Sequence, residues 1–218
     1  MSDFSLWDIY RNLLLALRWT MVLSAIAFVG GGVVGGLLLV LRLSGLCAAG
    51  YLVRGYVQLF QGTPLLLQLF LVYFGLPILG INTSPLFAAS LCLTLYASAY
   101  LTEIWHGSVE AIPRQQWEAA QSLALNFREQ LRYIILPQAL HVAIAPTVGF
   151  LVQAIKNTAL ASVIGFVELT RSGQIISNAT FSPFLVYGSV ALFYFFLCFP
   201  LSMWSRHLEQ RLSRRTNL

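Results

Sequence analysis

Residues 117–137 read WEAAQSLALNFREQLRYIILP and stand between two long apolar runs. The Ala, Gln, Leu and Glu residues of the first half favour a short helix. Asn126 followed by Glu129 matches a capping box that opens a second helix. The stretch therefore predicts a chain that leaves the membrane, forms an exposed helix over about 116–125 and returns. Such a helix is a place where another protein can dock.

Composition places the rest of the chain in a lipid bilayer. Hydrophobic residues make up 58% of the sequence and charged residues 10%, against about 25% charged residues in soluble domains. A helix needs roughly 20 apolar residues to cross the hydrocarbon core. We therefore expect an all-α integral membrane protein with about five transmembrane helices. The expected spans are residues 18–41, 64–79, 85–104, 131–153 and 183–204.

Short polar signals divide the chain into segments. Thr63-Pro64, Ser84-Pro85 and Ser182-Pro183 each place a capping side chain before a proline at the first helical position. Residues 1–17 mix apolar and charged side chains, which predicts an interfacial amphipathic segment. A single transmembrane domain is expected over 18–207, and residues 208–218 form a basic tail.

The first span carries an unusual run of glycines. Residues 30–36 read GGGVVGG, which holds two interleaved pairs of small residues four positions apart. Small residues let helices approach closely, so we expect a helix-packing face. A nucleotide-binding loop is the alternative, but no Gly-Lys-Ser/Thr sequence follows.

The distribution of basic residues predicts the orientation. With five spans and a cytoplasmic tail, nine of the 13 Lys and Arg residues lie on the cytoplasmic side. Cytoplasmic loops of membrane proteins carry such an excess. The N-terminus is therefore expected outside and the C-terminus in the cytoplasm, together with residues 116–125. The net charge of +5 belongs to these loops and does not indicate nucleic acid as a partner.

No residue pattern resembles a catalytic centre. The sequence has no nucleophile elbow, no HExxH and no Walker lysine, and His106, His141 and His207 are widely spaced. We therefore expect no enzyme activity, no metal site and no cofactor bound by this chain.

The segment at 118–137 resembles the EAA loop of permeases from ATP-binding-cassette (ABC) importers. That loop usually reads Glu-Ala-Ala, three residues, Gly, and then Ile-x-Leu-Pro. Here Ala124 stands at the glycine position, which keeps the helix–turn–helix pattern but counts against a sharp turn at residue 124. Four further segments look like the polar amino acid branch of that family, and the resemblance covers roughly residues 12–210. They are GTPLLLQ at 62–68, YFGLP at 73–77, AYLTE at 99–103 and LASVIG at 160–165.

This resemblance implies a type I importer permease fold in a bacterial inner membrane. It implies a second permease subunit, identical or homologous, two cytoplasmic ATPase subunits that use ATP and Mg, and an extracytoplasmic binding protein. The exposed helix would be the coupling helix that docks in the ATPase. Its contacts would be Glu118, Ala119, Ala120, Leu123 and Ala124. The alternative for Glu118 is an acid that merely stabilises the start of the helix through its dipole.

Polar residues near the spans are candidates for a translocation path, because they are costly at membrane depth. Relatives often carry Lys-Asp-Thr-Ser-Leu where this chain has KNTAL at 156–160. The missing acid at Asn157 favours a heterodimer, in which a different subunit supplies the charge. The alternative is a structural turn. The candidate path residues are Gln153, Lys156, Asn157, Thr158, Glu168 and Glu103.

Glu103 has two interpretations. It is either a gate or a tether between helices, or an interfacial acid paired with an arginine. For the whole chain, the alternative to an ATP-driven importer is a secondary transporter driven by an ion gradient. Such a protein predicts paired repeats and buried acids at mid-membrane, and the sequence shows neither.

Overall fold

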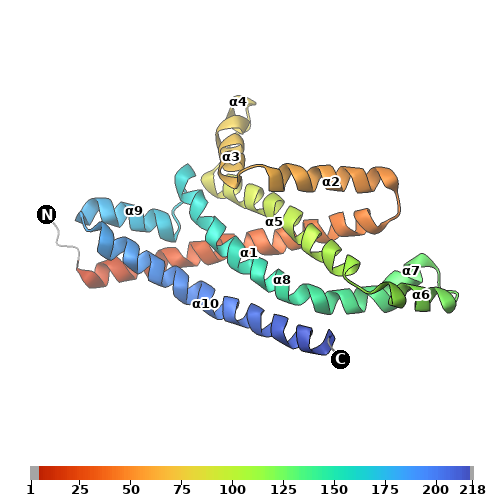
Figure 1. The fold of residues 1–218 in the computed structure, drawn as a ribbon. Coiled ribbons are helices and arrows are strands. Elements are labelled where there is room, and N and C mark those ends of the chain that lie inside the picture. Colours follow the sequence, from red (N-terminus) through yellow and green to blue (C-terminus); the bar gives the residue numbers. More distant parts are fainter. Residues whose placement is uncertain (1–4, 217–218) are drawn as a thin grey trace.

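The computed structural model describes residues 5–216, with side chains through Leu212, and all regular structure in that part is helical (Figure 1). The expected all-α architecture is therefore confirmed. The long helices are α1 (Leu6–Leu43), α2 (Cys47–Gly62), α5 (Pro85–Glu110), α8 (Leu136–Asn157) and α10 (Pro183–Thr216). The shorter helices are α3 (Leu65–Phe70), α4 (Leu76–Ile78), α6 (Arg114–Ser122), α7 (Phe127–Glu129) and α9 (Leu169–Thr180). Two π-helical segments, η1 (Leu71–Gly75) and η2 (Gln130–Ile135), and a 3-10 segment, η3 (Thr158–Ile164), continue neighbouring helices.

Four continuous helical stretches are long and apolar enough to cross a membrane. They are Leu6–Leu43, Pro85–Glu110, Phe127–Ile164 and Pro183–Leu212. A fifth crossing is obtained by counting the pair Cys47–Gly62 and Leu65–Ile78, which is bent by 99°. The expected number of about five spans therefore fits, but the second span is a broken helix pair in which 64–79 supplies only the second arm.

The bend between α2 and α3 has a clear local cause. Thr63 ends α2, and its Oγ1 donates a hydrogen bond of 2.7 Å to the Leu59 carbonyl. Pro64 has no N–H to continue the helix. Gln68 Nε2 then donates to the Phe60 carbonyl at 3.0 Å and to Thr63 Oγ1 at 2.8 Å, which ties the two arms together. The expectation that Thr63 caps the next helix is wrong, because Thr63 is used to close the preceding one.

The first helix is longer than the sequence predicted. The structure has one helix from Leu6 to Leu43, with no boundary near residue 18. Ser5 caps it, since Ser5 Oγ accepts from the Asp8 backbone N–H and Asp8 accepts from the Ser5 N–H. No proline follows in the helix to interrupt it. Residues 1–4 of the predicted amphipathic segment lie outside the described residues.

The glycine run of α1 is a helix-packing face, as the sequence predicts, and the structure shows that its partner is α5. A Cβ atom added at Gly31 would lie 2.5 Å from Ala97 Cβ, and one added at Gly35 would lie 3.0 Å from the Ser98 carbonyl oxygen. Thr102 Oγ1 donates a hydrogen bond of 3.2 Å to the Gly35 carbonyl across the same contact. The two helix backbones can therefore approach closely only because these positions lack side chains.

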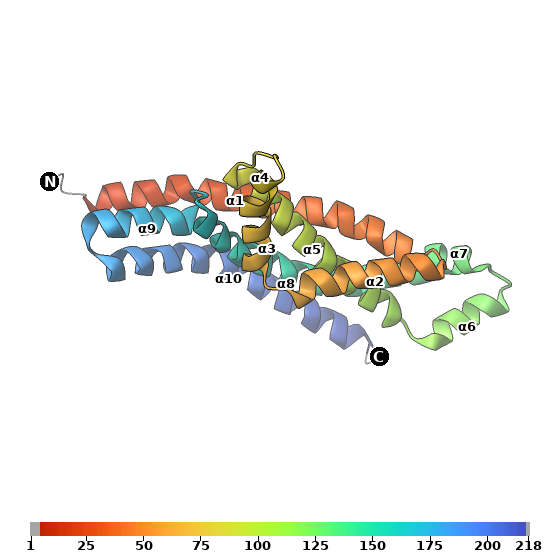
Figure 2. The same cartoon turned by 90° about the horizontal axis from the view of Figure 1, so that it is seen from above.

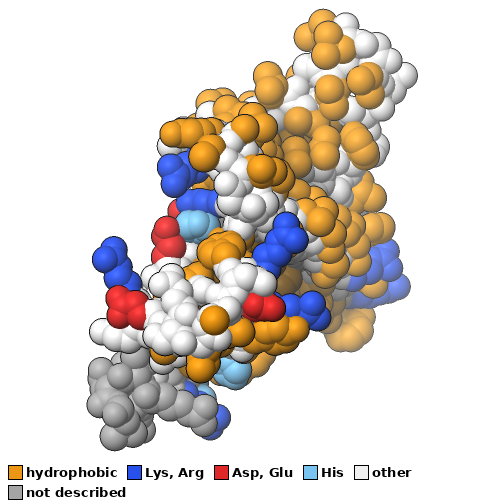
Figure 3. All heavy atoms as spheres, turned by 90° about the vertical axis from the view of Figure 1, so that its right-hand side faces the viewer, with side chains coloured by type: hydrophobic (Ala, Val, Ile, Leu, Met, Phe, Trp, Pro, Cys, Tyr) orange, Lys and Arg blue, Asp and Glu red, His pale blue; other side chains and the backbone are white. Residues whose placement is uncertain are grey.

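The polar connection after α8 folds back onto the bundle. Figure 2 shows α9 lying between α1 and α10 near the N-terminal end of the molecule. Leu169 and Ile176 of α9 are buried against Leu13 of α1 and Val186 of α10. The opposite end carries α6 and α7 (Figure 1). Viewed from that side, basic, acidic and histidine side chains gather among the hydrophobic ones (Figure 3).

Candidate functional site

The exposed helix predicted at 116–125 is α6, which covers Arg114–Ser122. Pro113 precedes it and ends the turn after α5. The side chains of Glu118 and Ala119 are exposed, whereas Ala120 is fully buried on the opposite face. Leu123 directly after the helix is also exposed. The helix therefore offers a carboxylate, a small side chain and an apolar side chain on an open surface.

A sharp turn ends α6, contrary to the expectation for an alanine at residue 124. Ala124 adopts φ = +56°, in the left-handed region that favours glycine. The Ala124 N–H donates to the Gln121 carbonyl at 2.8 Å, and the Leu125 N–H donates to the Ala120 carbonyl at 3.4 Å. These two bonds form a Schellman motif, which satisfies the final carbonyls of the helix. The hydrogen bonds hold the alanine in a strained conformation that its side chain disfavours.

Replacing Ala124 by glycine is expected to stabilise the protein by about 1 kcal/mol, because glycine has no Cβ to clash in the left-handed region. The apparent melting temperature in detergent should rise by ~2–4 °C. The matched control is Ala119→Gly, which makes the same change inside α6. That variant should lose stability, since glycine costs about 1 kcal/mol within a helix. A melting temperature of Ala124→Gly at or below that of the wild type contradicts the prediction.

Residues after the turn hold α6 in place. Asn126 Oδ1 accepts from the Glu129 N–H at 3.1 Å and Glu129 Oε2 accepts from the Asn126 N–H at 2.9 Å, so the predicted capping box is confirmed. The buried Gln130 donates through Nε2 to the Leu125 carbonyl at 2.7 Å. Trp117 stacks on Phe127, with ring centroids 6.1 Å apart. The α6 helix is thus fixed to the start of the next span by side chains that the EAA pattern does not contain.

The candidate path residues divide into an exposed and a buried group. Gln153 and Lys156 are exposed on α8 and Asn157 is half-buried, with Gln153 Nε2 donating to Asn157 Oδ1 at 3.1 Å. Thr158 is fully buried, and its Oγ1 donates to the Ile155 carbonyl at 2.7 Å. The structure therefore brings three of the predicted residues to one accessible polar face, and it places Thr158 behind that face.

Glu168 is fully buried and joins three helices. Its Oε1 accepts from the Arg171 N–H at 2.9 Å and so caps α9, while its Oε2 accepts from the Tyr194 hydroxyl of α10 at 2.9 Å. Thr20 of α1 lies 3.4 Å from Oε2 and accepts from the Leu169 N–H. Burial raises the pKa of Glu168, opposed by the backbone hydrogen bonds from Thr170 and Arg171. In this structure the carboxyl is a packing and capping group.

Truncation of Glu168 to alanine is expected to lower stability by about 2–4 kcal/mol, since a helix cap is lost and the partly buried Tyr194 hydroxyl loses the carboxylate as an acceptor. Glu168→Gln keeps an acceptor oxygen and should lose less. The raised pKa means that the folded state favours the protonated carboxyl, so the contribution of Glu168 to stability decreases as the pH rises above the unfolded pKa. The loss in melting temperature from pH 5 to pH 8 should therefore be smaller in Glu168→Gln than in the wild type. An equal loss in both contradicts the burial argument.

Glu103 pairs with an arginine on another helix. Glu103 Oε2 lies 2.6 Å from Arg42 Nη1, which joins α5 to the end of α1. The pair therefore combines the two interpretations, because the acid is paired with an arginine and also tethers two helices. Among the described residues no group of three or more His, Cys, Asp or Glu side chains is placed to hold a metal ion.

Relatives of known sequence agree with this architecture. The chain is 33% identical over 195 residues to the probable glutamine ABC transporter permease GlnM of Bacillus subtilis, covering 89% of this chain and 90% of that protein. It is 32% identical to the L-cystine transport system permease TcyB of the same organism, covering 96% and 89%. It is also 32% identical to the glutamine transport system permease GlnP of Escherichia coli, covering 95% and 96%.

Solved structures share the fold. The crystal structure of an amino acid ABC transporter with histidines matches with a TM-score of 0.90 and 30% identity, covering 97% of this chain and 99% of that chain. An inward-facing MetNI methionine ABC transporter matches with a TM-score of 0.70 and 23% identity, covering 96% and 99%. The model of the family described as binding-protein-dependent transport system inner membrane components matches residues 45–214. This chain therefore belongs to that family and is a transmembrane ABC transporter permease.

Proposed function

We propose that this chain is the permease subunit of an ATP-driven, binding-protein-dependent importer of polar amino acids in a bacterial inner membrane. Its relatives carry names that refer to glutamine, L-cystine and amino acid transport. Membership of the permease family also counts against a secondary transporter. The substrate class rests on these relatives, and the coupling to ATP rests on the geometry of α6.

The geometry of α6 is the observation that carries the proposal. The helix lies at the end of the bundle. Glu118, Ala119 and the following residue, Leu123, are exposed to solvent, whereas Ala120 is buried on the opposite face. An ATPase subunit in the cytoplasm would bind this surface, so that its movement on ATP and Mg binding displaces α6. The capping box and the Trp117–Phe127 stack would carry that displacement into the span that begins at Phe127. With α6 on the cytoplasmic side and five crossings, the N-terminus would lie on the outer side of the membrane and the C-terminal tail in the cytoplasm.

The translocation path would form between this chain and a second permease subunit. Gln153, Lys156 and Asn157 supply the accessible polar face of α8. Thr158 and Glu168 would position this segment from the buried side. The Arg42–Glu103 pair would tether the helices at the end nearer α6. Polar side chains at an open surface of an apolar bundle need a partner or water, which the second subunit and the substrate supply.

The proposal is tested by ATP hydrolysis in lipid nanodiscs that hold this chain with its ATPase, its second permease subunit and its binding protein. Hydrolysis should rise only when the binding protein is loaded with a polar amino acid, from a panel that includes glutamine and cystine. Failure of any ATPase to associate would overturn the coupling role of α6. Association without stimulation by any amino acid would overturn the substrate class.

A further inference from the structure

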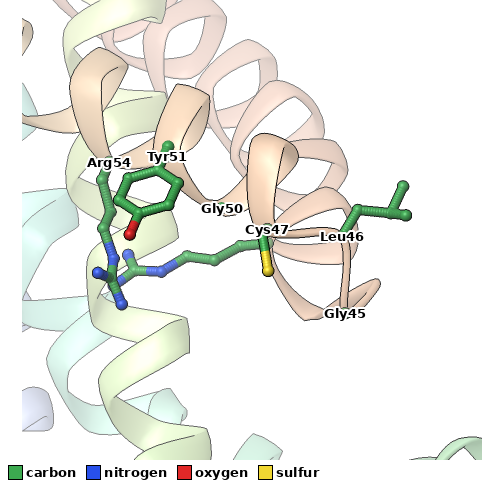
Figure 4. Close-up of a pocket in the computed structure, with 7 residues that line it drawn as sticks. Gly45, Leu46, Cys47, Gly50, Tyr51 and Arg54 are labelled. Carbon is green, nitrogen blue, oxygen red and sulfur yellow. The ribbon is translucent and has the colours of Figure 1, made fainter.

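A cavity of about 280 Å³ lies at the turn between α1 and α2, at the end of the bundle that carries α6. Figure 4 shows Tyr51 and Arg54 extending from α2 toward the same point, with Cys47 at the start of the helix. The cavity is lined by Arg42, Gly45, Leu46, Cys47, Gly50, Tyr51 and Arg54. Two arginines and a tyrosine hydroxyl thus face one space, and the lining contains no acidic residue.

The Arg42 side chain is nearly buried, but only part of its guanidinium group has a hydrogen-bond partner. Its side chain is 10% exposed, and its Nη1 bonds to Glu103 at 2.6 Å. Its buried Nε has no hydrogen-bond partner. Arg54 is exposed, and no acid pairs with it among the described residues. Because Glu103 neutralises only one of the two guanidinium groups, the cavity keeps a net positive charge.

The start of α2 adds further donors to the same cavity. Leu46 occupies the N-cap position, where it makes no side-chain cap hydrogen bond. The first backbone N–H groups of a helix have no partner within it, and the helix dipole makes that end positive. Helix starts of this kind bind phosphate and other anions. A 16-residue helix with an uncapped start therefore faces the same space as the two arginines.

We propose that this cavity binds the phosphate group of an anionic phospholipid. Arginine forms strong paired hydrogen bonds with phosphate oxygens. The rim is apolar and open, since Leu46 is 64% exposed, Tyr51 73% and Leu52 73%. These side chains would contact the acyl chains next to the bound headgroup, which a free phosphate does not have. The lipid would hold the α1–α2 turn at the membrane surface, independently of which substrate is transported.

Native mass spectrometry of the delipidated full chain with equal amounts of phosphatidylglycerol and phosphatidylcholine tests the proposal. The wild type should retain phosphatidylglycerol preferentially. Arg54→Gln should weaken the binding of phosphatidylglycerol by about tenfold, because one charged hydrogen-bond donor is lost. The matched control is Arg128→Gln, which removes another exposed arginine at the same end of the bundle but outside the cavity. That control should leave the preference unchanged.

Arg42→Gln alone would leave Glu103 unpaired, so the double variant Arg42→Gln/Glu103→Gln is the second test. It removes both charges together and should also lose the preference for phosphatidylglycerol. Equal retention of the two lipids by the wild type would overturn the proposal, as would equal losses in Arg54→Gln and Arg128→Gln. Displacement of the lipid by inorganic phosphate at equal concentration would show that the site takes free phosphate instead.

Discussion

The variant Gly31→Ala is expected to lower the stability of the protein by about 2–3 kcal/mol, the cost of forcing extra volume into a packed contact. The new Cβ would lie 2.5 Å from Ala97 Cβ and 3.1 Å from the Ala97 carbonyl carbon and the Ser98 nitrogen. Two of these neighbours are backbone atoms of α5, which cannot move aside as a flexible side chain can. The α1–α5 contact must therefore separate.

The neighbouring glycine provides the control. A Cβ added at Gly32 has only Trp105 Cη2 within 4 Å, at 3.8 Å, which is an ordinary contact. Alanine is favoured over glycine inside a helix by roughly 0.5–1 kcal/mol, so Gly32→Ala should be neutral or slightly stabilising. The two variants are compared by apparent melting temperature and by yield of monodisperse protein. A Gly31→Ala protein as stable as Gly32→Ala would show that the two helices are not in close contact.

Glu118→Lys is expected to reduce substrate uptake at least about tenfold while leaving the protein folded, because the change replaces one charged contact of the proposed docking surface by an opposed charge. The side chain is exposed, and the one side-chain hydrogen bond recorded for this residue among the described residues goes to its backbone carbonyl, from Ser122 Oγ at 3.0 Å. ATP hydrolysis by the complex should no longer respond to the loaded binding protein. Uptake and hydrolysis are measured in the same proteoliposomes.

The control for this variant is Glu209→Lys, which makes the same charge change at an exposed site of α10, outside α6. It should transport at the rate of the wild type. If Glu118→Lys also transports at that rate, the alternative holds, and the carboxylate only stabilises its own helix. Melting temperatures of both variants should equal that of the wild type, which separates a docking defect from misfolding.

Features that depend on residues close in sequence could be predicted. The capping box of Asn126 and Glu129 follows from two residues three positions apart. The helix start at Ser84-Pro85 is also as predicted, with Ser84 Oγ accepting from the Phe87 N–H at 3.2 Å. The glycine run predicted a close helix contact, although the sequence could not identify α5 as its partner. Sequence spacing carries the two capping signals because those interactions lie within one helical turn.

Features that depend on distant partners could not be predicted. Thr63 before a proline has the pattern of an N-cap, yet its hydroxyl donates to the Leu59 carbonyl of the preceding helix. Across the bend, Gln68 Nε2 of the next helix donates to the Thr63 carbonyl. The burial of Glu168 depends on Thr20 and Tyr194, which are 148 and 26 positions away. No local pattern distinguishes a buried capping carboxylate from one that lines a path. The sequence therefore identifies the site residues as polar but does not indicate which helices surround them.

The left-handed alanine at the end of α6 also has a genetic consequence. Every alanine codon becomes a glycine codon by one base change at its second position, so a single mutation of the gene reaches the residue that fits φ = +56° at Ala124 without steric strain. The turn that links the proposed docking helix to the membrane can thus be relaxed in one mutational step. Random mutagenesis followed by selection for heat-resistant protein should recover this change repeatedly, and transport by the selected variants would then show whether function depends on the strain.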